Sequence, residues 1–137
     1  MSDLYLAFDY GLTRIGVATG QTLTRTASPL TVLKARNGTP NWEHIGALIS
    51  EWQPAALVVG LPINMDGSDN PITVRARKFA KRLHGRFHLT AHLVDERLST
   101  QEARGLTARH GTDIEHDGAL DTAAACVILN QFLQHAP

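Results

Sequence analysis

The sequence has one cysteine, no long apolar run and no excess of charge of either sign. The single cysteine, Cys126, excludes an intrachain disulfide, and this fits a reducing compartment. No apolar run approaches the roughly 20 residues that a membrane-spanning helix needs. The N-terminus also lacks the basic and apolar segments of a signal peptide. We therefore expect a cytoplasmic protein with no membrane partner.

Thirteen Lys and Arg residues balance thirteen Asp and Glu residues, so the formal net charge is zero. Nucleic-acid-binding proteins usually carry an excess of positive charge, so this balance argues mildly against such a partner. The total, however, hides local clusters of basic and acidic residues. The chain has 137 residues, of which 43% are hydrophobic. This length and composition predict one domain, spanning residues 1–137, with a substantial buried core.

Apolar runs and the breaks between them predict the element order β-β-β-α-β-α-β-α-α. The run at residues 55–60 is apolar on both faces, as is typical of a central strand covered by helices. We expect an α/β fold with a mixed five-stranded sheet in the order 3-2-1-4-5 and helices on both faces. The strands are expected at residues 4–9, 14–19, 30–35, 55–60 and 88–95. The helices are expected at residues 41–52, 71–83, from Ser99 onward, and 118–133.

Carboxylates occur at three places that such a sheet would bring together. Asp9 ends the first predicted strand, Asp95 and Glu96 end the fifth, and Asp117 and Asp121 lie one helical turn apart at the start of the last helix. The carboxyl ends of parallel strands form the usual functional crevice of α/β sheets. Converging carboxylates repel each other unless a cation lies between them, and oxygen ligands select Mg²⁺ or Mn²⁺. Two such ions about 4 Å apart can support phosphodiester cleavage by water.

Each carboxylate also has a purely structural interpretation. A carboxylate at a strand end is more often a cap or a salt-bridge partner than a metal ligand. Asp117 could simply cap the last helix, where its charge suits the helix dipole. The metal site is favoured because several such positions occur together.

Basic residues form a row on the predicted second helix. Arg75, Lys78 and Arg82 share one helical face, with apolar residues on the other. Such a row can bind nucleic-acid phosphates, although a solvated helix face explains it equally well. Arg14 and Arg97 flank the predicted carboxylates and could either hold a phosphate by bidentate contacts or neutralise their acidic neighbours.

Five stretches of the chain resemble the YqgF/RuvX family of bacterial nucleases. A lone Asp-x-Gly would be a weak signal, but the five stretches together are specific and span nearly the whole chain in the family's order. They are residues 6–18 (LAFDYGLTRIGVA), 58–68 (VVGLPINMDGS), 76–80 (ARKFA), 95–103 (DERLSTQEA) and 121–129 (DTAAACVIL).

The resemblance implies a ribonuclease H-like fold and a metal-dependent nuclease. By the family's pattern, Asp9, Glu96 and Asp121 would be catalytic and hold Mg²⁺ or Mn²⁺, as two ions. The implied activity is processing of the 5′ end of pre-16S rRNA, with resolution of Holliday junctions in recombination and repair as the alternative. The nucleic-acid partner would be precursor rRNA or branched or single-stranded DNA. A short, neutral chain suits binding as a homodimer or in a ribosomal context.

Two ligand positions stay open at this point. Many relatives of the fold carry the second carboxylate at the end of the fourth strand, where this chain has Gly60. The family's pattern moves the role to the fifth strand, and strand alternation lets only one of Asp95 and Glu96 point into the site. We favour Glu96, with Asp66 as a weaker candidate. The acidic stretch before the last helix departs from the family's lysine-bearing one, so Asp117 stays an alternative to Asp121.

Two other functions compete with the nuclease. The stretch at residues 9–18 looks like the first phosphate motif of the actin, sugar-kinase and Hsp70 type of ATPase, but those proteins need two lobes and this chain has the length of one. A non-catalytic nucleic-acid-binding module would also keep the fold. The intact set of acidic positions argues against it.

Overall fold

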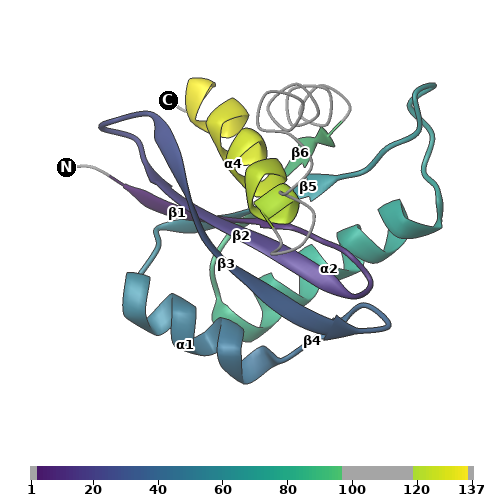
Figure 1. Cartoon of the computed structure of the whole chain (residues 1–137), viewed down its shortest axis with the longest axis horizontal. Helices are drawn as coiled ribbons and strands as arrows, with labels where there is room; N and C mark the ends of the chain where they lie inside the picture. Colours follow the sequence, from purple (N-terminus) through teal and green to yellow (C-terminus); the bar gives the residue numbers. More distant parts are fainter. Residues whose placement is uncertain (1–2, 97–118, 136–137) are drawn as a thin grey trace.

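The computed structural model describes residues 3–96 and 119–135. The expected α/β class is confirmed, and the expected strand order is found with one short strand added at the edge (Figure 1). In these residues the sheet has six strands, in the order β4-β3-β2-β1-β5-β6. The helix expected from Ser99 lies outside the described residues. The elements are β1 (Leu4–Asp9), β2 (Arg14–Gln21), β3 (Thr26–Arg36), β4 (Thr39–Pro40), α1 (Trp42–Trp52), β5 (Ala56–Leu61), α2 (Pro71–Phe87), β6 (Ala91–Asp95) and α4 (Ala119–Gln134).

The sheet is mixed, and its three parallel strands end at the same edge. Strands β1, β2 and β3 form an antiparallel meander, while β5 pairs in parallel with β1, and β6 in parallel with β5. The carboxyl ends of β1, β5 and β6 therefore lie at one edge of the sheet, with β5 in the middle. Asp9 and Glu96 occur at this edge.

The starts of two strands lie three or four residues from their expected positions, each for a local reason. Strand β3 begins at Thr26 and not at Leu30, because its pairing with β2 shifts register opposite Pro29. Such a bulge accommodates a proline, which has no N–H for the ladder. Strand β6 begins at Ala91 and not at residue 88, because His88 has a left-handed backbone (φ 58°) and ends α2.

The two helices between the strands begin where the sequence predicts. The Asn41 side chain accepts hydrogen bonds from the backbone N–H groups of the first turn of α1. Asn70 and Thr73 form a reciprocal capping box at α2, with Pro71 at the first helical position. Helix α2 continues to Phe87, four residues past the predicted end.

Helices cover both faces of the sheet, as expected. Helices α1 and α2 pack on one face and α4 crosses the other (Figure 1). Alternation along β1 divides its side chains between two cores, with Leu6 and Phe8 facing α1 and α2, and Ala7 facing α4. Asp9, two residues after Ala7, therefore projects on the α4 face. None of the helices in the described residues is long and apolar enough to cross a membrane.

Candidate active site

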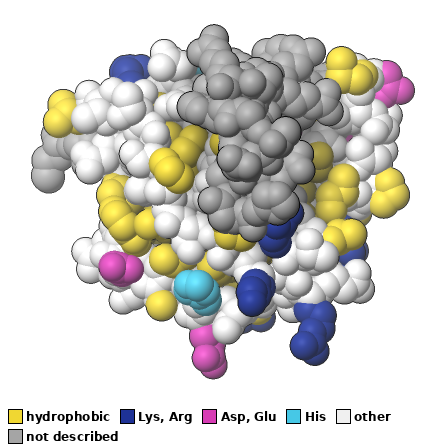
Figure 2. Space-filling model, viewed as in Figure 1, with side chains coloured by type: hydrophobic (Ala, Val, Ile, Leu, Met, Phe, Trp, Pro, Cys, Tyr) yellow, Lys and Arg dark blue, Asp and Glu magenta, His cyan; other side chains and the backbone are white. Residues whose placement is uncertain are grey.

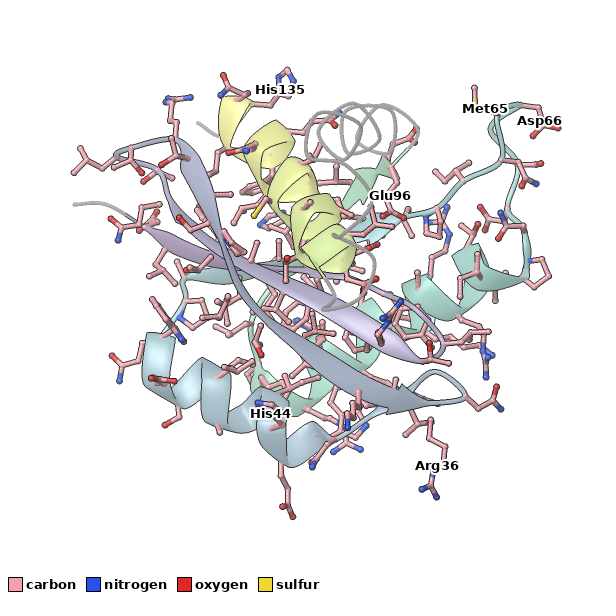
Figure 3. All side chains as sticks on the ribbon, in the orientation of Figure 1. Arg36, His44, Met65, Asp66, Glu96 and His135 are labelled. Atoms are coloured by element: carbon pink, nitrogen blue, oxygen red, sulfur yellow. The ribbon has the colours of Figure 1, made fainter. Side chains whose placement is uncertain are left out.

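Asp9 and Glu96 come from two strands that flank β5 and project on the same face. Asp9 ends β1 on the α4 face, and Glu96 follows β6. Along β6, Val94 packs in the core under α4, so Glu96, two residues later, points to that face as well. Figure 3 shows Glu96 at the end of β6, beside the end of β5. The side chain is only 7% exposed.

Gly60 in β5 provides the space that Glu96 occupies. A Cβ atom at this position would lie 2.8 Å from the Glu96 Cγ, and closer still to Cδ1 of Ile128 in α4. Any side chain at residue 60 would therefore push the carboxylate, the helix or both. Because Gly60 has no side chain, the carboxylate from the edge strand β6 can reach across the neighbouring strand towards Asp9.

Asp9 and Glu96 share a hydrogen bond, and the pKa of each is raised, so that both are harder to ionise than exposed carboxyl groups. Burial is the main cause that raises the pKa of Asp9 well above its usual range, and the hydrogen bond to Glu96 and the charges of Glu96 and Asp121 raise it further. Burial also raises the pKa of Glu96, with help from the charge of Asp95, while the hydrogen bond from Asp9 opposes the rise. These directions mean that Asp9 donates and Glu96 accepts. The pair holds a proton between its members and titrates as a unit.

Asp121 lies in the first turn of α4, next to the same pair. Gly16, the cross-strand partner of Asp9, allows this approach, because its Cβ would collide with the backbone carbonyl of Asp121. The Asp121 Oδ2 atom lies 3.3 Å from Nε of the exposed Arg14. The geometry is not that of a hydrogen bond, and this buried oxygen accepts none in the described part of the chain. Buried carboxylate oxygens without a donor are costly, so the position suits a cation.

The other predicted acidic residues are not brought to this site, or lie outside the description. Asp95 alternates with Glu96 and so lies on the opposite face, where its neighbour Leu93 borders α2. Asp66 lies at the tip of the loop between β5 and α2, away from Glu96 (Figure 3), and accepts hydrogen bonds from Ser68. Arg97 and Asp117 lie outside the described residues.

The predicted basic row is on the other side of the sheet. Arg75, Lys78 and Arg82 line a pocket together with Tyr10 and Trp42. Tyr10 packs in the core that α1 and α2 cover, not in the core under α4. The sheet therefore lies between the basic row and the carboxylates. Among the described basic residues, Arg14 lies at the carboxylate site.

Two glycines position the site in a way that the sequence did not predict. Gly16 and Gly60 both lie inside strands, where glycine weakens the strand and often marks a close approach of another group. That signal was available, since both residues fall within the stretches that resemble the family. What approaches each glycine depends on α4 and β6, which come from distant parts of the sequence.

The donor set fits a hard divalent cation, but it is not preassembled. In residues 3–96 and 119–135, no three Asp, Glu, His or Cys side chains are arranged to hold one metal ion. Asp9 and Glu96 instead share a proton, and Asp121 is turned towards Arg14. A divalent cation would favour the deprotonated carboxylates and would interact with Asp121 Oδ2, which accepts no hydrogen bond in the described part of the chain.

Comparisons with solved structures show which fold the chain shares. A Thermus thermophilus RuvC in complex with a Holliday junction substrate aligns with a TM-score of 0.57 at 17% identity, covering 96% of this chain and 93% of that one. A fowlpox virus resolvase in complex with Holliday junction DNA aligns with a TM-score of 0.53 at 12% identity, covering 96% and 97%. At these identities the likeness concerns the fold, and it confirms the expected ribonuclease H-like class.

Sequence comparisons identify the family. Proteins of Salmonella paratyphi B and Salmonella typhi that carry the name "Putative pre-16S rRNA nuclease" are each 54% identical over 135 residues, covering 98% of both chains. A family model described as RuvX, Holliday junction resolvase, matches residues 3–135. Since both matches extend over nearly the whole chain, the protein belongs to the RuvX family.

Proposed function

We propose that the chain is a nuclease that hydrolyses nucleic-acid phosphodiesters, with Asp9, Glu96 and Asp121 as its catalytic, metal-holding residues. The observation that carries the proposal is the hydrogen-bonded pair of the partly buried Asp9 and the buried Glu96. Beside it lies Asp121 Oδ2, which accepts no hydrogen bond in the described part of the chain. Family membership supports the reaction class, because the family and the relatives are named for cutting nucleic acids.

Each residue has a distinct task in this proposal. Asp9, Glu96 and Asp121 would hold Mg²⁺ or Mn²⁺, Asp9 and Glu96 as deprotonated carboxylates and Asp121 through the oxygen that accepts no hydrogen bond in the described part of the chain. Bound divalent ions, as a pair, would supply an activated water and offset the charge of the leaving oxygen. Arg14, exposed beside Asp121, is placed to hold a phosphate oxygen once the carboxylate turns away from it. The same role for Arg97 stays a prediction.

We infer precursor 16S rRNA as the natural substrate, because the relatives at 54% identity are named for it. Branched DNA is the alternative, since the family description names Holliday junctions. A non-catalytic binding module is disfavoured, because the acid pair is destabilising unless it serves a ligand. A cytoplasmic location, one domain over residues 1–137 and a homodimer stay predictions.

A cleavage panel tests the proposal. Precursor 16S rRNA carrying its 5′ leader, a four-way junction and single-stranded DNA are each incubated with the protein in Mn²⁺, Mg²⁺ or EDTA. We expect metal-dependent cleavage of the RNA. Asp9→Asn should reduce the rate at least about 100-fold, since even the outer partners of metal ligands contribute roughly 10- to 100-fold.

The outcomes separate the alternatives. Equal cleavage by wild type and Asp9→Asn would refute the assignment of the acid pair. Cleavage of the junction with the RNA left intact would establish the resolvase. Binding of nucleic acid without cleavage of any substrate in either metal would leave the binding module.

A further inference from the structure

A cavity of about 130 Å³ lies on the face of the sheet opposite the acid pair. It opens between α2, the start of α1 and the turn that joins β3 to β4. Its basic members are Arg75, Lys78 and Arg82, and its wall includes Tyr10, Asn37 and Trp42. None of these residues takes part in the carboxylate site, so the cavity needs its own explanation.

The cavity is cationic and lacks a counter-charge. No Asp or Glu is among its lining residues. In the described part of the chain, the ion pairs join Arg14 to Asp121 and Arg77 to Asp69, and neither involves Lys78 or Arg82. Basic side chains also gather in the lower right of the face viewed in Figure 2, towards the end of the sheet that carries β4. An anion would therefore meet concentrated positive charge here.

The walls are held in place before any ligand arrives. Arg75 donates to the Oδ1 atom and the backbone carbonyl of Asn37, at 3.3 and 3.1 Å, so its guanidinium is anchored at the rim. The Tyr10 hydroxyl donates to the Gly38 carbonyl at 2.7 Å, which ties the turn to β1. Gly38 has a φ of 82°, and a Cβ there would collide with the Tyr10 hydroxyl.

Aromatic packing braces the other side of the cavity. The Trp42 ring stacks on Phe79, with centroids 5.8 Å apart, and the Arg86 guanidinium lies over the Trp42 ring at 4.4 Å. Anchored walls reduce the entropy that a ligand must remove when it binds. The anchored Arg75, Tyr10 and Trp42 distinguish the cavity from a bare helix face, while Lys78 and Arg82 line it as exposed side chains.

The volume indicates what size of ligand fits. Pockets for drug-sized molecules and cofactors begin at roughly 300 Å³, so about 130 Å³ is too small for a coenzyme and suits a single tetrahedral anion. Arginine forks match phosphate oxygens in bidentate contacts, and lysine adds a point charge. Phosphate is the anion that this set of donors recognises best.

We propose that this cavity is a phosphate-binding site on the face of the protein remote from the acid pair. The phosphate is carried either by a nucleic-acid strand that passes round the β4 end of the sheet, or by a small free anion. In the first case the site holds the strand at a distance from the scissile bond. The proposal stands independently of the nuclease assignment, because it needs no residue of the carboxylate site.

The first arm of the test uses inorganic phosphate. Amide shifts of residues 37–39 and the indole N–H of Trp42 are followed by NMR during a phosphate titration, at ionic strength held constant with NaCl. We expect saturable shifts in the wild type and at least tenfold weaker binding in the double variant Lys78→Ala/Arg82→Ala. Arg75 is kept, because it anchors Asn37. Arg77→Ala/Lys81→Ala removes the same charge from the same helix outside the cavity and should bind like the wild type.

The second arm identifies the carrier of the phosphate. Binding of a single-stranded oligonucleotide is measured in EDTA over a range of salt concentrations. If a strand occupies the cavity, the cavity variant should flatten the log–log salt slope by about 1.4, since each single-strand phosphate contact contributes about 0.7. An unchanged slope, with phosphate binding still dependent on Lys78 and Arg82, assigns the site to a free anion.

The proposal is overturned if phosphate causes no saturable shift at residues 37–39 in the wild type. It is also overturned if the control variant loses binding as much as the cavity variant does. Unfolding temperatures of both variants are measured first, so that a loss of binding is not a loss of folding.

Discussion

At the scale of single residues, the site depends on a glycine, which has no side chain, as much as on the carboxylates themselves. Asp9 and Glu96 come within hydrogen-bonding distance because Gly60, on the strand between them, has no Cβ. The carboxylate of Glu96 occupies space that any other residue at position 60 would fill. Its pKa is raised mainly because it is buried there. Gly60 is thus a positioning residue for the acid pair.

We expect Gly60→Ala to displace Glu96 and to lower metal-dependent cleavage at least about tenfold, since supporting residues of metal sites contribute roughly 10- to 100-fold. Overpacking should also lower the free energy of unfolding by about 1–3 kcal/mol. The control is Gly85→Ala in α2, where nothing lies within 4 Å of an added Cβ. The control should keep full activity and gain about 0.5–1 kcal/mol. Equal activity of the two variants would contradict the role of Gly60.

At the scale of elements, the packing of α4 on the sheet positions Asp121 beside the end of β1. Its first turn rests on Gly16, and further along Leu129 and Leu133 lie against Gly20. At the far end, Arg25 donates to the Leu133 carbonyl, and the Ala27 N–H donates to the Asn130 side chain at 2.9 Å. The N-terminal end of α4 therefore places Asp121 at the site, while its C-terminal half is hydrogen-bonded to the sheet and to the turn before β3.

Substitutions at the two ends should separate activity from stability. Gly16→Ala pushes the first turn of α4 away and should reduce cleavage at least about tenfold, by the same argument about support of metal ligands. Asn130→Ala leaves a backbone donor without its partner and should lower the free energy of unfolding by about 1–3 kcal/mol. Its cleavage rate below the unfolding transition should match the wild type. A loss of activity in Asn130→Ala as large as in Gly16→Ala would contradict this division.

At the scale of the whole molecule, the acid pair links stability to pH and to metal. The pKa of Asp9 and that of Glu96 are both raised in the folded state, so the folded protein holds more protons than the unfolded chain. The stability from this source is present below the ordinary carboxyl pKa of about 4. It is lost as pH rises through the raised values. Near neutral pH the metal-free protein therefore carries an uncompensated penalty.

Asp9→Asn should remove this penalty, because its amide can donate to Glu96 as protonated Asp9 does. In EDTA, the free energy of unfolding of the wild type minus that of Asp9→Asn should fall as pH rises from about 4 to 7, the direction set by the raised pKa. With Mn²⁺ at about 100 times its Kd, the wild type should gain about 2.7 kcal/mol and the variant much less. Denaturant unfolding across this pH range measures both effects. If the difference in unfolding free energy between the wild type and Asp9→Asn in EDTA stayed constant with pH, Asp9 and Glu96 would not share a proton.

The sequence by itself determined what depends on near neighbours in the chain. Side-chain periodicity and caps such as Asn41 and Asn70 predicted the helix starts, and the order of apolar runs predicted the strand order. The boundaries of β3 and β6 were missed, because a bulge opposite Pro29 and the left-handed His88 depend on pairing and on backbone geometry. The sequence identified the candidate carboxylates, but it did not show which of them contact one another.

Only the tertiary structure decided which candidates meet. Whether Asp95 or Glu96 faces Asp9 depends on the register of β6 beside β5, where a shift of one residue exchanges the two faces. The basic row of α2 likewise lines a separate, open pocket and not the acid site, because α2 packs on the opposite face of the sheet from α4. Periodicity shows that residues share a face. Which element covers that face is set by contacts between segments far apart in the chain.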